Sequence, residues 1–444
     1  MEIVIITLFV LGYLAITLEH TIKMDKLIPA LSMMALLWAV VSIYHLPVFQ
    51  VDITSKKLIP SHIDELLLHH LGKTAEILVF LLGAMTIVEI IDYFNGFATI
   101  KNFIKTKSKK GLLFIFSALA FLLSAIIDNL TATIVLITIL QKVIIVRNTR
   151  IWYAGLIIIS ANAGGAWSPI GDVTTTMLWI GDKVTTGKLI LNLFIPSIVC
   201  MIVPVLIATQ LTAFRGNLFD DIGKEESHHQ VHKYGSTILY LGLSAIIFVP
   251  IFKILTHLPP YVGMMLSLAV VATFAEIFSN SKINITSIDE DHEKYSSHSP
   301  VHSSLSKIEL PSILFFLGIL MAVAALESLG MLFEFAKTIN KTIPNTDIVV
   351  ILLGFGSAII DNVPLVAASM GMFSQLIDHP LWHFIAFSAG TGGSMLIIGS
   401  AAGVVAMGME RIDFFWYLKK ISWLALIGFI SGSFTFILMR DFTI

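Results

Sequence analysis

The chain has 444 residues, of which 56% are hydrophobic and only 13% are charged, and its formal net charge is −2. A soluble domain carries about 25% charged residues. This composition, with a mean hydropathy of +0.88, excludes an ordinary water-soluble enzyme and a disordered chain, and it leaves no basic excess for nucleic acid. It predicts an all-α polytopic membrane protein.

Ordinary membrane-spanning helices are predicted wherever an apolar stretch approaches the roughly 20 residues that cross a bilayer. These stretches are residues 3–18, 27–45, 74–91, 189–211, 236–255, 261–278, 310–329 and 414–439. Two polar stretches, 215–233 and 279–307, separate some of them and predict solvent loops.

The apolar region 111–146 does not fit a simple crossing, because one helix of its 36 residues would be about 54 Å long. Basic residues flank both of its ends, among them Lys109, Lys110, Arg147 and Arg150. The positive-inside rule places both ends in the cytoplasm. The region therefore predicts a re-entrant helical hairpin that turns near Asp128.

The hexapeptide SAIIDN occurs twice, at residues 124–129 and again 233 residues later at 357–362, which indicates an internal duplication. A second hairpin is predicted over 347–377, turning near Asp361. After each hairpin comes an apolar stretch broken by Gly, Pro or both, at 151–180 and 382–407. Such residues interrupt a helix, and unwound backbone survives in a membrane only inside protein or along a cavity.

Counting crossings from a cytoplasmic 101–110 segment gives the two halves opposite orientations, with ten crossings and two hairpins. Inverted repeats with discontinuous helices are typical of secondary transporters. The predicted organisation is N-terminal helices and a connecting loop at 1–70, a first inverted repeat at 71–212, linking helices and polar cytoplasmic loops at 213–308, and a second inverted repeat at 309–444.

Three carboxylates lie at the predicted breaks: Asp128, Asp172 and Asp361. An ionised Asp in a bilayer costs at least about 2.5 kcal/mol and is a functional candidate by default. Neutral oxygen-bearing side chains accompany them, and such ligands suit a hard cation. These are Asn129, Thr131, Asn162, Ser168, Thr174, Thr175, Thr176, Asn362 and Ser394.

A buried carboxylate also binds a proton, so a site that takes Na⁺ or H⁺ alternately predicts an antiporter. Each signal has a purely structural alternative. The Asp residues are good helix caps, and the Thr hydroxyls can bond to their own helix. Glu76 and Glu327 are further candidates for a proton path. There is no GxxxxGK[ST] loop in the sequence, which argues against ATP as the energy source.

At these residues the sequence resembles the NhaD-type sodium/proton antiporters. The resemblance rests on LLGAMTIVE (81–89), IDNLTAT (127–133), ISANAGGAWSPIGDVTTTM (159–177), GSAIIDNVP (356–364) and GTGGS (390–394). It implies the ion-pathway residues Asp128, Asn129, Asn162, Asp172, Thr174, Thr175, Ser357, Asp361 and Asn362. It also implies export of Na⁺, and of Li⁺, against H⁺ across a bacterial inner membrane by a homodimer without a cofactor.

Three alternatives remain at this stage. An organic-anion or arsenite carrier on the same scaffold is one, although three acids would meet an anion poorly. An intramembrane aspartyl protease using Asp128 and Asp361 is the second. A passive channel is the third, but it has no need of two matched halves.

Overall fold

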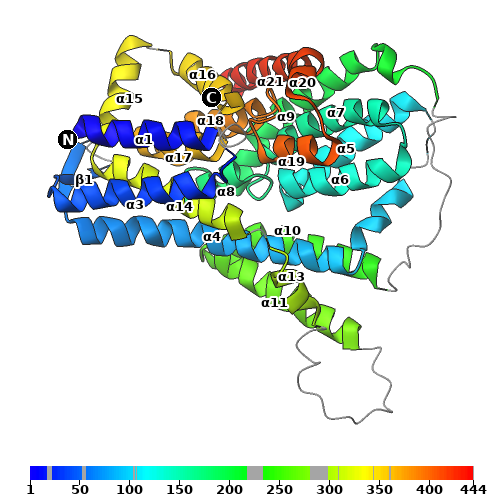
Figure 1. Cartoon of the computed structure of the whole chain (residues 1–444), viewed down its shortest axis with the longest axis horizontal. Helices are drawn as coiled ribbons and strands as arrows, with labels where there is room; N and C mark the ends of the chain where they lie inside the picture. Colours follow the sequence, from blue (N-terminus) through cyan, green and yellow to red (C-terminus); the bar gives the residue numbers. More distant parts are fainter. Residues whose placement is uncertain are drawn as a thin grey trace, which may run out of the picture.

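The computed structural model describes residues 1–17, 23–52, 57–103, 106, 108–217, 234–280, 299–308, 310–343, 345–359 and 362–443 (Figure 1). The predicted site residue Asp361 lies outside the described residues. So does most of the two predicted polar loops, at 218–233 and 281–298.

Seven helices in the described part of the chain are long and apolar enough to cross a membrane, so the protein is a multi-pass membrane protein. They are α4 (Ile63–Tyr93), α5 (Lys109–Ile127), α9 (Thr186–Ala208), α10 (Gly235–Thr256), α11 (Pro260–Asn280), α14 (Leu310–Ser328) and α21 (Ser422–Thr443). All except α5 correspond to predicted spans. The span predicted at 414–439 is divided, because α20 (Phe414–Lys420) ends before α21 begins.

The N-terminal region contains two shorter helices, α1 (Glu2–Thr17) and α3 (Leu27–Ile43). They pack against each other, and α3 also packs along α14. Between α3 and α4 the chain forms an antiparallel strand pair, β1 (Val48–Asp52) with β2 (Lys57–Ser61). The sequence predicted only a connecting loop here. The pair is a small addition to an otherwise helical fold, and β1 contacts α14.

The first predicted break is present at Asp128. Helix α5 ends at Ile127 and α6 (Asn129–Val143) begins one residue later. Helix α7 (Arg147–Gly165) then ends at its glycine pair, and α8 (Val173–Ile180) follows after a non-helical stretch. Figure 1 shows α5, α6 and α7 stacked beside one another, and α5 contacts both of the others.

The second half contains the same series of elements. Helix α16 (Thr346–Ile359) is followed by α17 (Asn362–Met372), and α18 (Pro380–Gly392) is followed after a break by α19 (Ala401–Glu410). Helix α16 packs against α18 as α5 packs against α7. In addition α8 contacts α17, and α19 contacts α6. The helix that follows each break therefore packs against a helix of the other half.

Two kinds of contact, one made by glycines and one by serines, occur in both halves. A Cβ added at Gly164 would lie 2.2 Å from the carbonyl oxygen of Phe121, and one added at Gly392 would lie 2.2 Å from that of Gly354. Only glycine permits this approach of helix backbones. Ser124 Oγ donates to the carbonyl of Ala161 at 2.6 Å, and the repeated serine of the second hexapeptide donates to an alanine carbonyl of α18 at 2.7 Å.

The remaining elements are short and connect the long helices. They are η1 (Gly96–Phe103), η2 (Thr212–Phe214), α13 (Pro300–Leu305) and α15 (Met331–Thr342). Helices α10 and α11 pack together along α4, on the side of the molecule away from α21 (Figure 1). The broken helices are therefore surrounded by protein on several sides, which is where unwound backbone is tolerated in a membrane.

Candidate functional site

Asp172 is a buried carboxylate, 2% exposed, at the start of α8. Pro169 and Gly171 precede it in the stretch between α7 and α8, where a regular helix cannot continue. Asp is a favoured N-cap residue, and here its Oδ1 accepts a hydrogen bond from the backbone N–H of Thr174 at 3.3 Å. The cap fixes one carboxylate oxygen on its own helix and leaves the other for partners from elsewhere.

The second oxygen of Asp172 receives side-chain amides from both halves of the chain. Asn362 Nδ2 donates to Oδ2 at 3.0 Å, and Asn129 Nδ2 approaches the same atom at 3.4 Å. Both asparagines are buried, and each is the first residue of its helix, α17 and α6 respectively. The two copies of SAIIDN therefore meet at one carboxylate, although 233 residues separate them.

The network continues through Asn162 on α7, which is fully buried. Its Oδ1 accepts from Asn129 Nδ2 at 2.9 Å, and its Nδ2 donates to Ser400 Oγ at 3.0 Å. Ser400 in turn caps α19, because its Oγ accepts from the backbone N–H of Gly403 at 3.2 Å. One chain of polar contacts thus joins Asp172, Asn129, Asn162 and Ser400 across both halves.

The starts of four helices, α6, α8, α17 and α19, contribute to this network. Helix N-termini carry unpaired N–H groups and partial positive charge, which stabilise a carboxylate nearby. The side-chain amides and hydroxyls also bring oxygen atoms to the same place. The site therefore combines one carboxylate with several neutral polar side chains, all of them buried.

Asp128 lies at the start of α6 and is partly buried. Its Oδ1 accepts from the backbone N–H of Thr131 at 2.9 Å, and its Oδ2 accepts from the Thr131 hydroxyl at 2.8 Å. The backbone of Asp128 has φ 73° and ψ 160°, a region that residues other than glycine rarely adopt. Such strain is typical of functional positions, and it makes the break at Asp128 sharp.

Four further predicted hydroxyl residues fall into two groups. Thr175, Ser357 and Ser394 donate to backbone carbonyls, of Asp172, Ala389 and Thr391 respectively, and so support the breaks and the helix packing. Thr174 Oγ1 differs, since this buried oxygen has no hydrogen-bond partner among the described residues. Its backbone N–H bonds to Asp172, which places this threonine directly beside the carboxylate.

Ser400 was not predicted as a site residue, although the sequence carries a signal for it. Gly393 precedes Ser400 at the same spacing at which Gly165 precedes Asp172. Gly165 and Gly171 approach each other closely before Asp172, since a Cβ on Gly165 would lie 2.5 Å from the Gly171 carbonyl oxygen. In the second half a Cβ on Gly393 would lie 2.6 Å from the carbonyl oxygen of the residue before Ser400. Aligning the two glycine pairs puts Ser400 in the place of Asp172.

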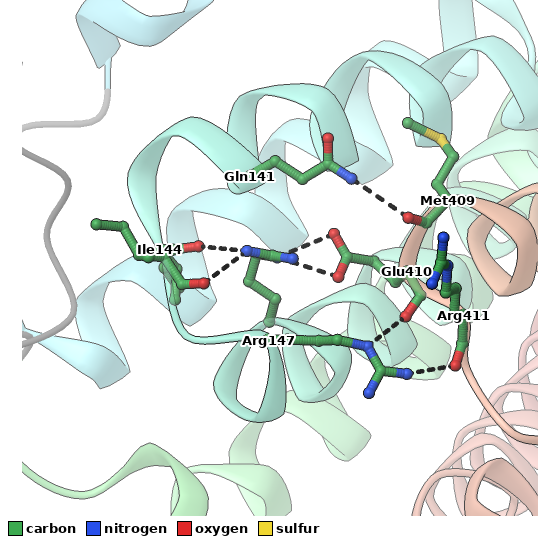
Figure 2. A network of polar contacts seen from close by, with 8 residues as sticks. Gln141, Ile144, Arg147, Met409, Glu410 and Arg411 are labelled. Carbon is green, nitrogen blue, oxygen red and sulfur yellow. Dashed lines mark hydrogen bonds and ion pairs between the residues drawn. The ribbon is translucent and has the colours of Figure 1, made fainter. Parts of the chain in front are cut away.

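A second polar network joins the two halves at the start of α7, and it too was not predicted (Figure 2). Arg150 Nε lies 3.0 Å from both carboxylate oxygens of Glu410, and its Nη1 donates to the carbonyls of Ile144 and Ile145. Arg147 donates to the carbonyls of Glu410 and Arg411. These contacts tie the beginning of α7 to the end of α19.

Comparison of the sequence with known proteins identifies its relatives. A family profile described as "Citrate transporter" matches residues 6–382. "Sodium/proton antiporter 1" of Arabidopsis thaliana is 40% identical over 97% of this chain and 71% of its own length. "Sodium/proton antiporter 2" of the same plant is 38% identical, over 98% of this chain and 99% of its own length. "Na(+)/H(+) antiporter NhaD" of Alkalimonas amylolytica is 30% identical, over 97% and 89%.

Proposed function

The chain belongs to the NhaD-type Na⁺/H⁺ antiporter family, and from this premise we propose that it exchanges Na⁺ for H⁺ by alternating access, with the Asp172 carboxylate binding the two cations in turn. The family consists of transporters, so the resemblance is confirmed and the intramembrane protease is excluded. Exchange of Li⁺ and assembly as a homodimer stay predictions. So does a bacterial inner membrane, since two of the similar proteins are from a plant.

The proposal is supported above all by the surroundings of Asp172. The carboxylate is buried, and its neighbours Asn129, Asn362 and Thr174 carry amide and hydroxyl oxygens. Carboxylate, amide and hydroxyl oxygens are ligands for hard cations such as Na⁺. An amide that rotates by half a turn presents its oxygen instead of its NH₂. The same carboxylate takes up a proton when Na⁺ leaves, so each ion displaces the other.

The paired contacts of the two halves support inverted repeats with re-entrant hairpins. Hairpin one consists of α5 and α6, and hairpin two of α16 and α17. Each broken helix crosses to the hairpin of the other half, α8 to α17 and α19 to α6. A site built on such crossed pairs belongs equally to both halves. Movement of this core relative to the surrounding helices would open it to one side at a time. Asp128 and, from the repeated hexapeptide, Asp361 are proposed as part of the ion pathway.

An organic-anion carrier remains the second candidate, because the matching family profile is described by citrate. The carboxylate of Asp172 disfavours this reading, since it would repel a carboxylate substrate in a place of low dielectric. Recognition of an anion is expected from Arg, from hydroxyls or from helix N-termini without an acid between them.

The decisive experiment uses the purified protein in liposomes with a pH-sensitive dye inside. Na⁺, Li⁺ and K⁺ are added in turn across several pH values, and citrate is offered in parallel. We expect Na⁺ to drive proton movement and Asp172→Asn to lower its rate on the order of 100-fold or more, because losing a charge at contact distance costs several kcal/mol.

The matched control is Asp182→Asn, just beyond the opposite end of α8. The Asp182 side chain is 69% exposed and pairs with Lys253 at 3.1 Å, so its removal should leave exchange unchanged. Full exchange by Asp172→Asn would refute the site. Citrate uptake without cation exchange by the wild-type protein would refute the function.

A further inference from the structure

A cavity of about 300 Å³ lies apart from the Asp172 network, where β1, α4, α14, α17 and the segment after α8 meet. Its polar lining consists of Gln50, His69, His70, Lys183, Glu327 and Ser374. Four of these side chains are titratable, which is an unusual concentration for a chain with 13% charged residues. We call this space the vestibule.

Glu327 is the carboxylate in the vestibule lining, near the end of α14. It packs against Gly371 of α17, where an added Cβ would lie 3.2 Å from Glu327 Oε2. Beside it, Ser328 Oγ lies 3.2 Å from His70 Nε2. The glycine thus gives the carboxylate a place against the helix that also carries Asn362.

Lys183 faces Glu327 across this space, from the segment between α8 and α9. Its Nζ lies 4.9 Å from the centre of the Trp382 ring. Burial lowers the pKa of Lys183 below its ordinary value, and the Glu327 carboxylate opposes that shift. The lysine therefore loses its proton more readily than an exposed lysine, and this loss leaves the Glu327 carboxyl group without a neighbouring cation.

Two helices connect the vestibule to the Asp172 network. Helix α8 begins after Asp172 and ends at Ile180, shortly before Lys183. Helix α17 begins at Asn362 and ends beside Gly371. At 1.5 Å per residue these helices are about 12 Å and 17 Å long, roughly half of a 30 Å hydrocarbon core. The network thus lies one half-membrane from the vestibule.

The opposite end of the core carries Arg147, Arg150 and Arg411. Helix α7 starts at Arg147, which contacts the carbonyl of Arg411, and the broken helix then runs through Asp172 toward Lys183. Because positive residues mark the cytoplasmic side, the vestibule belongs to the face away from the cytoplasm.

We propose that the vestibule is the aqueous route by which Na⁺ and H⁺ travel between Asp172 and the non-cytoplasmic face, with Glu327 as the residue that attracts the cation. This inference rests on the proposed antiport, and it adds an access path and a residue to it. Lys183 limits that attraction while it is protonated. Rising pH therefore strengthens it.

The test places a cysteine in the vestibule of a Cys200→Ala protein, since Cys200 is the only cysteine in the chain. Ser374→Cys lines the cavity, and Leu376→Cys is the control, two residues away with an exposed side chain outside the lining. A positively charged, membrane-impermeant thiol reagent is added to one face of sealed vesicles at a time.

We expect modification of Ser374→Cys from the non-cytoplasmic face to reduce exchange at least tenfold, because the attached charge repels cations in the route. Leu376→Cys should react without loss of exchange. Modification of Ser374→Cys with full exchange, or failure to modify it from that face, would overturn the vestibule. Absence of exchange by the wild-type protein would instead refute the proposed function, on which the route depends.

A second variant tests the proposed route if Ser374→Cys is inactive before treatment. Glu327→Gln should raise the half-saturating Na⁺ concentration on the non-cytoplasmic side about tenfold and leave that on the cytoplasmic side unchanged. Glu334→Gln is the control, because this exposed glutamate lies seven residues further along, on α15. An unchanged Na⁺ dependence in Glu327→Gln would overturn the proposed role of Glu327.

Discussion

The ion pair between Arg150 and Glu410 allows a quantitative prediction about how the two halves are held together. The Glu410 side chain is fully buried, and that of Arg150 is 17% exposed. Arg150→Met would leave the carboxylate without its partner in a place of low dielectric. Breaking such a pair costs about 3–5 kcal/mol, so we expect this single change to destabilise the protein by that amount.

The double variant, Arg150→Met with Glu410→Met, should be less damaging than Arg150→Met alone. It removes the uncompensated charge, and replacing both partners of a buried pair by apolar groups is often neutral. The carbonyls of Ile144 and Ile145 still lose a donor, and this adds about 1–3 kcal/mol. The two substitutions should therefore be coupled by about 2 kcal/mol or more.

The assay measures the free energy of unfolding in detergent micelles. It is applied to the single variants, the double variant and a surface control. Arg440 and Asp347 supply that control, since their bidentate pair at 2.6 and 2.9 Å joins α21 to α16 with both side chains partly exposed. Arg440→Met should cost only about 1 kcal/mol. Strictly additive losses at Arg150 and Glu410 would refute the argument from burial.

Three further predictions test the site, the packing and the vestibule. Asn362→Ala removes an amide 3.0 Å from Asp172, so the half-saturating Na⁺ concentration should rise about tenfold in the dye assay while the maximal rate persists. Gly392→Ala puts a methyl group 2.2 Å from a backbone carbonyl, whereas nothing lies within 4 Å of Gly408. Size-exclusion chromatography should show loss of folded protein for the first substitution only. Lys183→Met removes a cation whose pKa is already lowered. Its Na⁺ affinity at neutral pH should match that of the wild type at alkaline pH, whereas Lys183→Arg should shift the rise to higher pH.

The breaks in the helices were predictable because they depend on local chemistry. The structure confirms that a helix ends next to Asp128, and that Pro169 and Gly171 lie in a non-helical stretch. The long apolar spans were predictable for the same reason, since membrane length sets their size. The repeated hexapeptide predicted an internal duplication, and its two serines, Ser124 and Ser357, each donate to an alanine carbonyl.

The unpredicted features depend on contacts between distant parts of the chain. Arg150 and Glu410 are separated by 260 residues, and the vestibule joins residues as far apart as Phe49 and Ser374. The strand pair was missed for a different reason. Two five-residue strands in a connection between helices carry little periodic signal, and a lone pair of this kind depends on its neighbours for stability. Here β1 packs against α14.

Asp172 and Ser400 occupy corresponding positions after the two breaks, and this correspondence bears on how the proposed site would bind one small cation. Both residues cap a helix after a close pair of glycines, yet one is a carboxylate and the other a hydroxyl. Two carboxylates facing each other would hold a proton between them, because both cannot ionise readily at close range. With Ser400 in the second position, the proposed site has one charge to neutralise, and either Na⁺ or H⁺ does so alone. In the proposed exchange, this asymmetry between the halves is what lets the two ions compete at Asp172.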